Sequence, residues 1–249
     1  MRALRPLMTV LVFLAVWWAV VRFGSVPVFM LPDPFSVAGA LWAQRDLLFW
    51  NTLTTLTEIL LGLFFGTLLG ALAALGIVFS AVLQRWLMPV LVLSQAIPVF
   101  ALAPLLVLWF GFGTESKVLM AVLVIFFPVT ANFADGLRRT EPGWLDLART
   151  MNASPFAMMR HVRVPAALPA FASGLRVATA VAPIGAIIGE WVGASSGLGF
   201  VMINANARIG TDLMFAALAV LSALAIGLYV LVDWALRRAL YWVTDSTGG

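Results

Sequence analysis

The chain has 249 residues, of which 63% are hydrophobic and only 10% are charged. Soluble domains carry about 25% charged residues, so this composition excludes a soluble globular protein and predicts an all-α integral membrane protein. The net charge of +4 does not indicate a nucleic-acid partner, because the basic residues are spread along a hydrophobic chain, as membrane topology requires.

Little catalytic or metal-binding chemistry is available to this sequence. It has no cysteine and a single histidine, His161, so disulfides and thiol chemistry are excluded and no metal site is expected.

Six segments are apolar enough to cross a hydrocarbon core of about 30 Å, and only helices can satisfy their backbone groups there. They are residues 7–21, 53–79, 86–110, 118–134, 168–188 and 213–236. The first is interpreted as a retained span and not as a signal peptide, because no small-x-small cleavage site follows it. A short interfacial helix is expected over 35–49, and Asn51-Thr52 is a plausible N-cap for the second span.

The basic residues predict the orientation. With the N-terminus inside, ten of them fall in inside segments and four in outside segments, and Arg176 lies within a span. The positive-inside rule then places both termini in the cytoplasm.

Gly62, Gly66 and Gly70 recur every four residues in the second span. Small residues at this spacing let helices approach closely. The contact is either packing within one subunit or a homodimer face, and the pattern leaves both open.

The loop over 137–167 is more than a connector. Pro142 suits the first turn of one short helix, and Ser154 and Pro155 suit the N-cap and first turn of a second, which should end before Pro165. Exposed apolar side chains rimmed by arginines predict either a docking site for another protein or an amphipathic hairpin resting on lipid headgroups.

This loop resembles the EAA loop of permease subunits of bacterial binding-protein-dependent ABC importers. The family pattern is Glu-Ala-Ala, three residues, Gly, nine residues and Ile-x-Leu-Pro. Here Asp146-Leu147-Ala148, Asn152 and Val162-Arg163-Val164-Pro165 stand at the same spacing. The residues depart from the pattern at Asp146, Leu147, Asn152, Val162 and Val164.

The rest of the chain resembles the nitrate/sulfonate/bicarbonate branch of that family. The matching segments are Leu31-Pro32-Asp33-Pro34, Pro98, Ala103-Pro104-Leu105, Trp109-Phe110-Gly111-Phe112-Gly113, Ala166-Ala167-Leu168-Pro169, Gly174-Leu175-Arg176 and Gly197-Leu198-Gly199. Within the branch, the segments 95–101 and 189–193 look most like permeases for thiamine-pyrimidine precursors.

The resemblance implies a single transmembrane permease domain over 1–249. Its first span would occupy 1–30, a periplasmic or interfacial segment 31–50, and the core 51–240, which includes the coupling loop 137–167. It also implies a multi-pass subunit of the bacterial inner membrane, most often in a homodimer, among membrane lipids. A cytoplasmic ABC ATPase dimer would supply ATP hydrolysis, and a periplasmic or lipid-anchored solute-binding protein would deliver solute. The permease itself is not expected to be an enzyme or to bind a cofactor, since ATP and Mg belong to the ATPase, and the chain has no phosphate-binding loop.

Two sets of residues are the candidates for function. The ATPase-coupling set is Trp144, Asp146, Leu147, Ala148, Met151, Asn152, Ala153, Ser154, Phe156 and Pro165. Polar residues inside spans usually face a cavity or a partner. The translocation-path set, which adds two aromatic residues and a proline, is Glu58, Gln95, Pro98, Phe100, Asn132, Arg176, Glu190 and Trp191.

Several readings stay open for individual residues. Asp146 is expected to pair with a partner base or to stabilise the start of its helix. Glu58 is equally compatible with pairing to a nearby base, Asn132 with an interhelical hydrogen bond, and Asp135 with an ion pair to Arg138 or Arg139.

The solute is expected to be a thiamine pyrimidine precursor, stacked on Phe100 or Trp191 and hydrogen-bonded to Gln95. Glu58 and Glu190 near the outer side oppose the anionic alternatives, which are nitrate, sulfonate, taurine and bicarbonate. The competing functions are a secondary transporter, for which no inverted repeat is evident, and an intramembrane enzyme, for which no catalytic set is evident.

Overall fold

The computed structural model describes residues 4–24 and 26–242, and these residues form helices and no strand. The helices are α1 (Leu4–Phe23), α2 (Pro34–Ala43), α3 (Arg45–Phe79), α4 (Ala81–Ala96), α5 (Val99–Phe110), α6 (Thr114–Arg138), α7 (Pro142–Thr150), α8 (Pro155–Met158), the π-helical turn η1 (Met159–Arg163), α9 (Val164–Trp191), α10 (Leu198–Ala207) and α11 (Thr211–Ala239).

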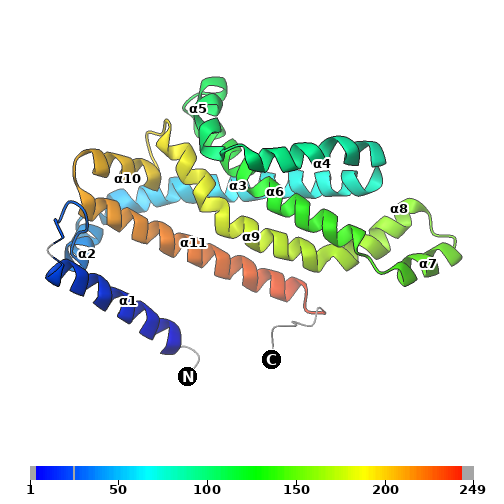
Figure 1. The fold of residues 1–249 in the computed structure, drawn as a ribbon, viewed down its shortest axis with the longest axis horizontal. Helices are drawn as coiled ribbons and strands as arrows, with labels where there is room; N and C mark the ends of the chain where they lie inside the picture. Colours follow the sequence, from blue (N-terminus) through cyan, green and yellow to red (C-terminus); the bar gives the residue numbers. More distant parts are fainter. Residues whose placement is uncertain (1–3, 25, 243–249) are drawn as a thin grey trace.

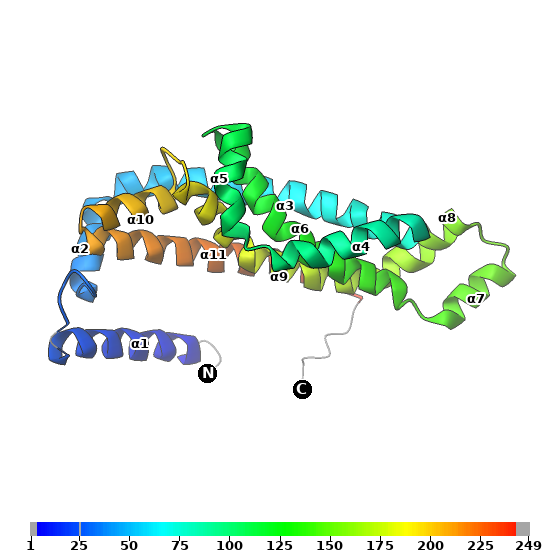
Figure 2. The same cartoon turned by 45° about the horizontal axis from the view of Figure 1, so that its top comes forward.

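The long helices α3, α6, α9 and α11 run side by side along the molecule, and the two ends of this bundle differ (Figure 1). α7 and α8 project from one end, whereas α2 and α10 lie at the other. α1 diverges from the bundle, and α5 stands across it (Figure 2). Four stretches are long and apolar enough to cross a membrane: Arg45–Phe79, Thr114–Arg138, Pro155–Trp191 and Thr211–Ala239.

The third span, predicted over 86–110 with a kink near Pro98, is not a single helix. The segment is divided into α4 and α5, with Ile97 in an extended conformation (ψ 121°) between them. Pro98 has no backbone N–H to donate and disfavours the helical conformation of the residue before it, so the helix ends there. α1 matches the first predicted span, and α3, α6, α9 and α11 match the others, which agrees with a count of about six.

The start of the second span was also predicted wrongly. α3 begins at Arg45, so the expected interfacial helix ends at Ala43 and only Gln44 separates the two helices. No glycine or proline interrupts residues 45–61, so nothing stops the helix from extending. At 35 residues α3 is about 52 Å long, which is more than the thickness of a hydrocarbon core. Asn51 therefore lies inside the helix and is not its N-cap.

The glycines of α3 bring it into close contact with α6. A Cβ at Gly62 would lie 2.5 Å from Cβ of Ala121, and one at Gly66 would lie 2.7 Å from Cγ2 of Ile125. α9 packs against α6 in the same way, since a Cβ at Gly185 would lie 2.8 Å from Cα of Ala121. The glycine pattern therefore serves packing within one subunit.

The Gly62→Ala substitution is expected to destabilise the protein by about 1–3 kcal/mol, because the added methyl group has no room between α3 and α6. Thermal unfolding of the purified protein in detergent measures the effect. Gly227→Ala in α11 is the matched control, since a Cβ there meets nothing within 4 Å. It should leave the stability unchanged or raise it, because alanine favours a helix over glycine. Equal effects of the two substitutions would contradict the packing argument.

Candidate functional site

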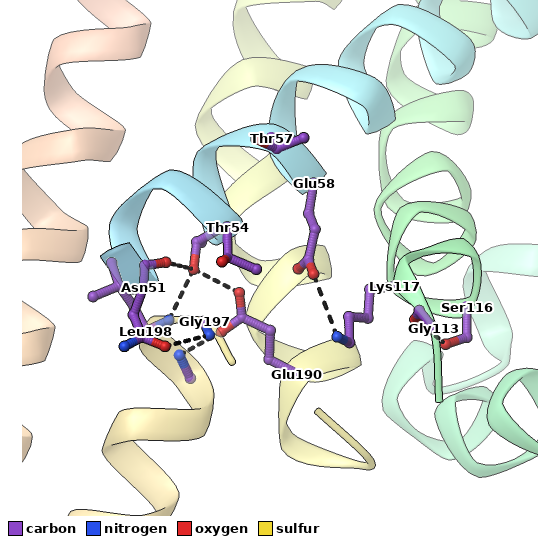
Figure 3. A network of polar contacts seen from close by, with 12 residues as sticks. Asn51, Thr54, Thr57, Glu58, Gly113, Ser116, Lys117, Glu190, Gly197 and Leu198 are labelled. Carbon is purple, nitrogen blue, oxygen red and sulfur yellow. Dashed lines mark hydrogen bonds and ion pairs between the residues drawn. The ribbon is translucent and has the colours of Figure 1, made fainter. Parts of the chain in front are cut away.

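A cluster of charged side chains is buried where α3, α6 and α9 meet. Glu58 of α3, Lys117 of α6 and Glu190 of α9 are exposed by 0%, 4% and 1%. Nζ of Lys117 lies 3.6 Å from Oε1 of Glu58, and the three side chains converge in Figure 3. Lys117 is the only lysine of the chain. Neither oxygen of Glu58 has a hydrogen-bond partner among the described residues, so Lys117 is its main electrostatic partner.

The carboxylate of Glu190 holds the start of α10 in place. Its Oε1 accepts a hydrogen bond from the Thr55 hydroxyl at 2.6 Å, and its Oε2 accepts one from the backbone N–H of Gly199. The first N–H groups of a helix lack partners within the helix and carry partial positive charge, so a carboxylate there is favourable. Glu190 therefore joins the end of α9 to the beginning of α10.

Two further residues of α3 complete this arrangement. The Thr55 hydroxyl oxygen accepts a hydrogen bond from the backbone N–H of Leu198 at 2.8 Å, and Oδ1 of Asn51 accepts one from Gly197 at 2.7 Å (Figure 3). Gly197 has a φ of 111°, and a Cβ there would overlap the carboxyl group of Glu190. Glycine is thus required at this position both by the backbone conformation and by the space that Glu190 fills.

The sequence interpretation singled out Glu58 and Glu190 but missed Asn51, Thr55 and Lys117. A signal was present, because Asn51, Thr55 and Glu58 are spaced at helical intervals and lie on the same face of α3. That face was obscured by the assumption that the helix starts near Leu53. Glu58 and Glu190 are buried within the subunit, so in this conformation they stabilise its interior instead of facing a cavity.

An apolar groove of about 650 Å³ brings together the aromatic residues of the path set. It is lined by Phe100, Pro183, Ile184, Ile187, Ile188, Trp191, Val192, Met202, Leu218 and Leu221. Phe100 from α5 and Trp191 from α9 are both exposed there, at 66% and 49%. The break at Pro98 creates this neighbourhood, because it directs α5 across the bundle.

The remaining residues of the path set lie elsewhere. Arg176 is paired with Asp233 of α11, with Nε at 2.7 Å from Oδ1. The Asn132 amide donates a hydrogen bond to the Pro128 carbonyl of its own helix, and among the described residues no interhelical hydrogen bond of Asn132 is present. The Gln95 side chain lies outside the described part of the structure, and its role stays a prediction.

At the opposite end of the bundle, α7 and α8 form the expected hairpin. Pro142 is the first residue of α7, and the Ser154 hydroxyl caps α8 by accepting from the N–H of Ala157. The expectation that the second helix ends before Pro165 is wrong. The chain continues through η1 into α9, because the wider π-helical turn of η1 lies just before Pro165 and accommodates its missing N–H within a continuous helical segment.

Asn152 occupies the glycine position of the EAA pattern and has a φ of 56°. Its N–H donates to the carbonyl of Arg149, and the N–H of Ala153 donates to the carbonyl of Ala148. These two bonds form the Schellman motif that ends a helix with one left-handed residue. Asparagine is the side chain that adopts this conformation most readily after glycine, so the departure from the pattern preserves the geometry.

The hairpin presents apolar side chains to its surroundings. Exposed large apolar residues gather on it, namely Trp144, Leu147, Met151 and Phe156. Ala148 is buried, whereas Asp146 is exposed and pairs with Arg149 at 2.7 Å. Asp146 lies beyond the first turn of α7, so it does not stabilise the start of that helix. The expected pairing of Asp135 with Arg139 is confirmed at 2.8 Å.

The Lys117→Met substitution is expected to destabilise the protein by about 3–5 kcal/mol, because it leaves buried carboxylates without a cation. The double substitution Glu58→Gln and Lys117→Met should recover most of this loss, since it removes both partners of the pair. Thermal unfolding of the three proteins, wild type and both variants, measures the effect. Recovery by less than a quarter of the loss would show that the ion pair is not the cause.

The arrangement of helices and the hairpin can be compared with known proteins. Residues 66–240 match the family described as the inner membrane component of binding-protein-dependent transport systems. A probable ABC transporter permease protein of Haemophilus influenzae is 54% identical, over 97% of this chain and 99% of that protein. The formylaminopyrimidine transport permease protein ThiX of Halalkalibacterium halodurans is 38% identical, over 90% of each chain.

The fold is also found in a solved structure. A chain of the MetNI methionine ABC transporter in an inward-facing conformation aligns with a TM-score of 0.69 at 21% identity, covering 79% of this chain and 97% of that one. This chain thus has a permease fold. Its buried polar cluster, the break between α4 and α5, and the exposed hairpin are parts of that fold in this chain. The chain belongs to the family of inner membrane components of binding-protein-dependent transport systems, and it is a transmembrane permease subunit of an ABC importer.

Proposed function

We propose that this permease subunit conducts a pyrimidine precursor of thiamine into the cell. The observation that carries this proposal is the apolar groove in which Phe100 and Trp191 are both exposed. Flat aromatic rings stack on such side chains, whereas small inorganic anions gain little from them. The similarity to a formylaminopyrimidine permease supports the same class of solute.

The charges near the groove also favour a neutral ring over an anion. Trp191 follows Glu190 directly, and the buried cluster that contains Glu190 has two acids, Glu58 and Glu190, against one cation, Lys117, so it gives an anion no net attraction. Arg176, the cation that would favour nitrate or a sulfonate, is already paired with Asp233. Gln95 is proposed to supply a hydrogen bond to the ring.

The subunit is proposed to work as one of two copies that enclose the path, with both termini in the cytoplasm. A solute-binding protein would deliver the pyrimidine from outside, and two cytoplasmic ATPase subunits would bind the hairpin. Trp144, Leu147, Met151 and Phe156 are the proposed anchors, since apolar and aromatic side chains dominate the energetics of protein interfaces.

The continuity of α8, η1 and α9 supplies the mechanical link. This stretch is one helical segment of 37 residues from Pro155 to Trp191. A displacement of the hairpin on closure of the ATPases would therefore move the helix that carries Glu190 and Trp191. Because Glu190 binds the start of α10, the wall of the groove formed by Trp191 and Met202 would move with it.

Solute specificity is tested by ATPase stimulation of the complete transporter with its binding protein in nanodiscs. A hydroxymethylpyrimidine or formylaminopyrimidine should stimulate hydrolysis, whereas nitrate, taurine, alkanesulfonates and bicarbonate should not. Trp191→Ala should weaken stimulation by the pyrimidine about three- to tenfold through lost stacking, whereas Trp109→Ala, an exposed tryptophan outside the groove, should not. Stimulation by anions alone would overturn the proposed solute and make Arg176 the next residue to test.

Coupling is tested by the association of the permease with its ATPase. The double substitution Trp144→Ala and Leu147→Ala should weaken association by about 30-fold or more, because aromatic and apolar anchors contribute most of the binding energy. Thr150→Ala on the same exposed helix is the control and should change association little. Surface plasmon resonance measures both. Equal affinity of the double variant and the wild type would place the ATPase elsewhere.

A further inference from the structure

A second pocket, distinct from the groove near Phe100, lies between the α3–α4 turn and the hairpin. It has a volume of about 410 Å³ and is lined by Val78, Phe79, Arg149, Ala153, Pro155, Met158, Met159 and Arg163. Two of these residues are cations, and none of the described lining residues is acidic. The pocket therefore has the charge of a site for an anion.

Arg163 is the residue of this pocket whose polar atoms are least satisfied. Its Nε is buried and has no hydrogen-bond partner among the described residues. A buried guanidinium N–H without a partner is unfavourable, and a phosphate oxygen is one of its best acceptors. Arg163 lines the pocket and has no acidic partner among the described residues, so its guanidinium group is available to an anion, which would reach the buried Nε after a shift of the side chain.

Arg149 adds a second cation from the other arm of the hairpin. It is paired with Asp146, but the two side chains are 62% and 68% exposed, so this pair contributes little stability. A phosphate group in the pocket could compete with that carboxylate. The net charge of Asp146, Arg149 and Arg163 is then +1, which matches the single negative charge of a phosphodiester.

The apolar residues that line the pocket indicate whether its phosphate ligand would be part of a lipid or a free ion. Val78 and Phe79 form the last turn of α3, which is one of the membrane-crossing helices, and Met158 lies opposite them. These side chains can cover acyl chains or a glycerol backbone, apolar parts that a lipid has and a free phosphate ion lacks. Basic pockets at the cytoplasmic ends of membrane helices are suited to anionic headgroups.

We propose that this pocket binds the phosphodiester headgroup of an anionic lipid of the cytoplasmic leaflet, with Arg163 and Arg149 as its ligands. The lipid joins the α3–α4 turn to the hairpin through which ATPase movement reaches α9. The inference rests on the proposed cytoplasmic side of the hairpin, but it does not depend on the proposed solute.

The test measures lipid binding to the complete permease–ATPase complex in detergent by native mass spectrometry. Short-chain phosphatidylglycerol is the probe, phosphatidylcholine with the same chains is the uncharged comparison, and inorganic phosphate is the soluble competitor. Arg163→Gln and Arg149→Gln should each weaken phosphatidylglycerol binding about fivefold, the effect of about one arginine at an anionic surface. Arg160→Gln is the matched control, because Arg160 lies on η1, is exposed and does not line the pocket.

Every outcome of this test bears on the proposal. Selective loss in the Arg163 and Arg149 variants, with Arg160→Gln unchanged, supports it. An equal loss in all three variants would mean diffuse attraction by surface charge, and displacement of the lipid by millimolar inorganic phosphate would mean a soluble anion; either result overturns it. If Arg163→Gln does not fold, the binding of phosphatidylglycerol to Arg163→Lys and Arg149→Gln tests the proposal instead. Unchanged binding in both variants also overturns the proposal.

Discussion

The structure depends on one set of buried polar contacts. Glu190 accepts a hydrogen bond from the first turn of α10, and the ion pair of Glu58 with Lys117 joins α3 to α6. A charge buried inside a membrane protein is costly unless an opposite charge or hydrogen-bond donors offset its burial. Here the pairing partners come from α3, α6, α9 and α10, so no single helix can satisfy its own polar residues. The polar groups therefore specify which helices must meet and in which register. Apolar side chains specify the register less well, because their contacts are similar at every register.

Close approach of the helices makes these contacts possible. Gly62 and Gly185 hold α3 and α9 against the same residue of α6, Ala121. With larger side chains at these positions the helices would be farther apart, and a separation of 3.6 Å between Lys117 and Glu58 could not be maintained. The packed region formed in this way reaches from the bundle to α10, whereas α5 stands across the bundle and the hairpin projects from its end (Figure 1). Movement driven from the hairpin is expected to be transmitted by α9 as a unit.

Features that depend on neighbouring residues in the sequence were well predicted. Local chemistry determines the apolar segments, the two short helices of the hairpin, and their proline and serine positions. Boundaries were less accurate, because helix propensity alone does not say where a helix begins or ends when no proline or glycine intervenes, as at Arg45. Nor does it show that a π-helical turn accommodates a proline, as it does before Pro165. Asn152 shows the same limit, since its left-handed conformation follows from the spacing of the hairpin but not from the residue itself.

The sequence by itself determined that this is a polytopic helical membrane protein with a helical hairpin between two spans, because hydropathy and turn chemistry are local properties. It also indicated that Glu58, Glu190, Phe100 and Trp191 are unusual for their positions. Only the tertiary structure decided that the two acids are buried beside Lys117 and Thr55 while the two aromatic residues share one groove. The physical reason is that the residues that meet are far apart in the chain: 59 positions separate Glu58 from Lys117, 91 separate Phe100 from Trp191 and 135 separate Thr55 from Glu190. Their contacts depend on the rotation of each helix about its axis. That rotation is set by packing between helices, which a single sequence does not display.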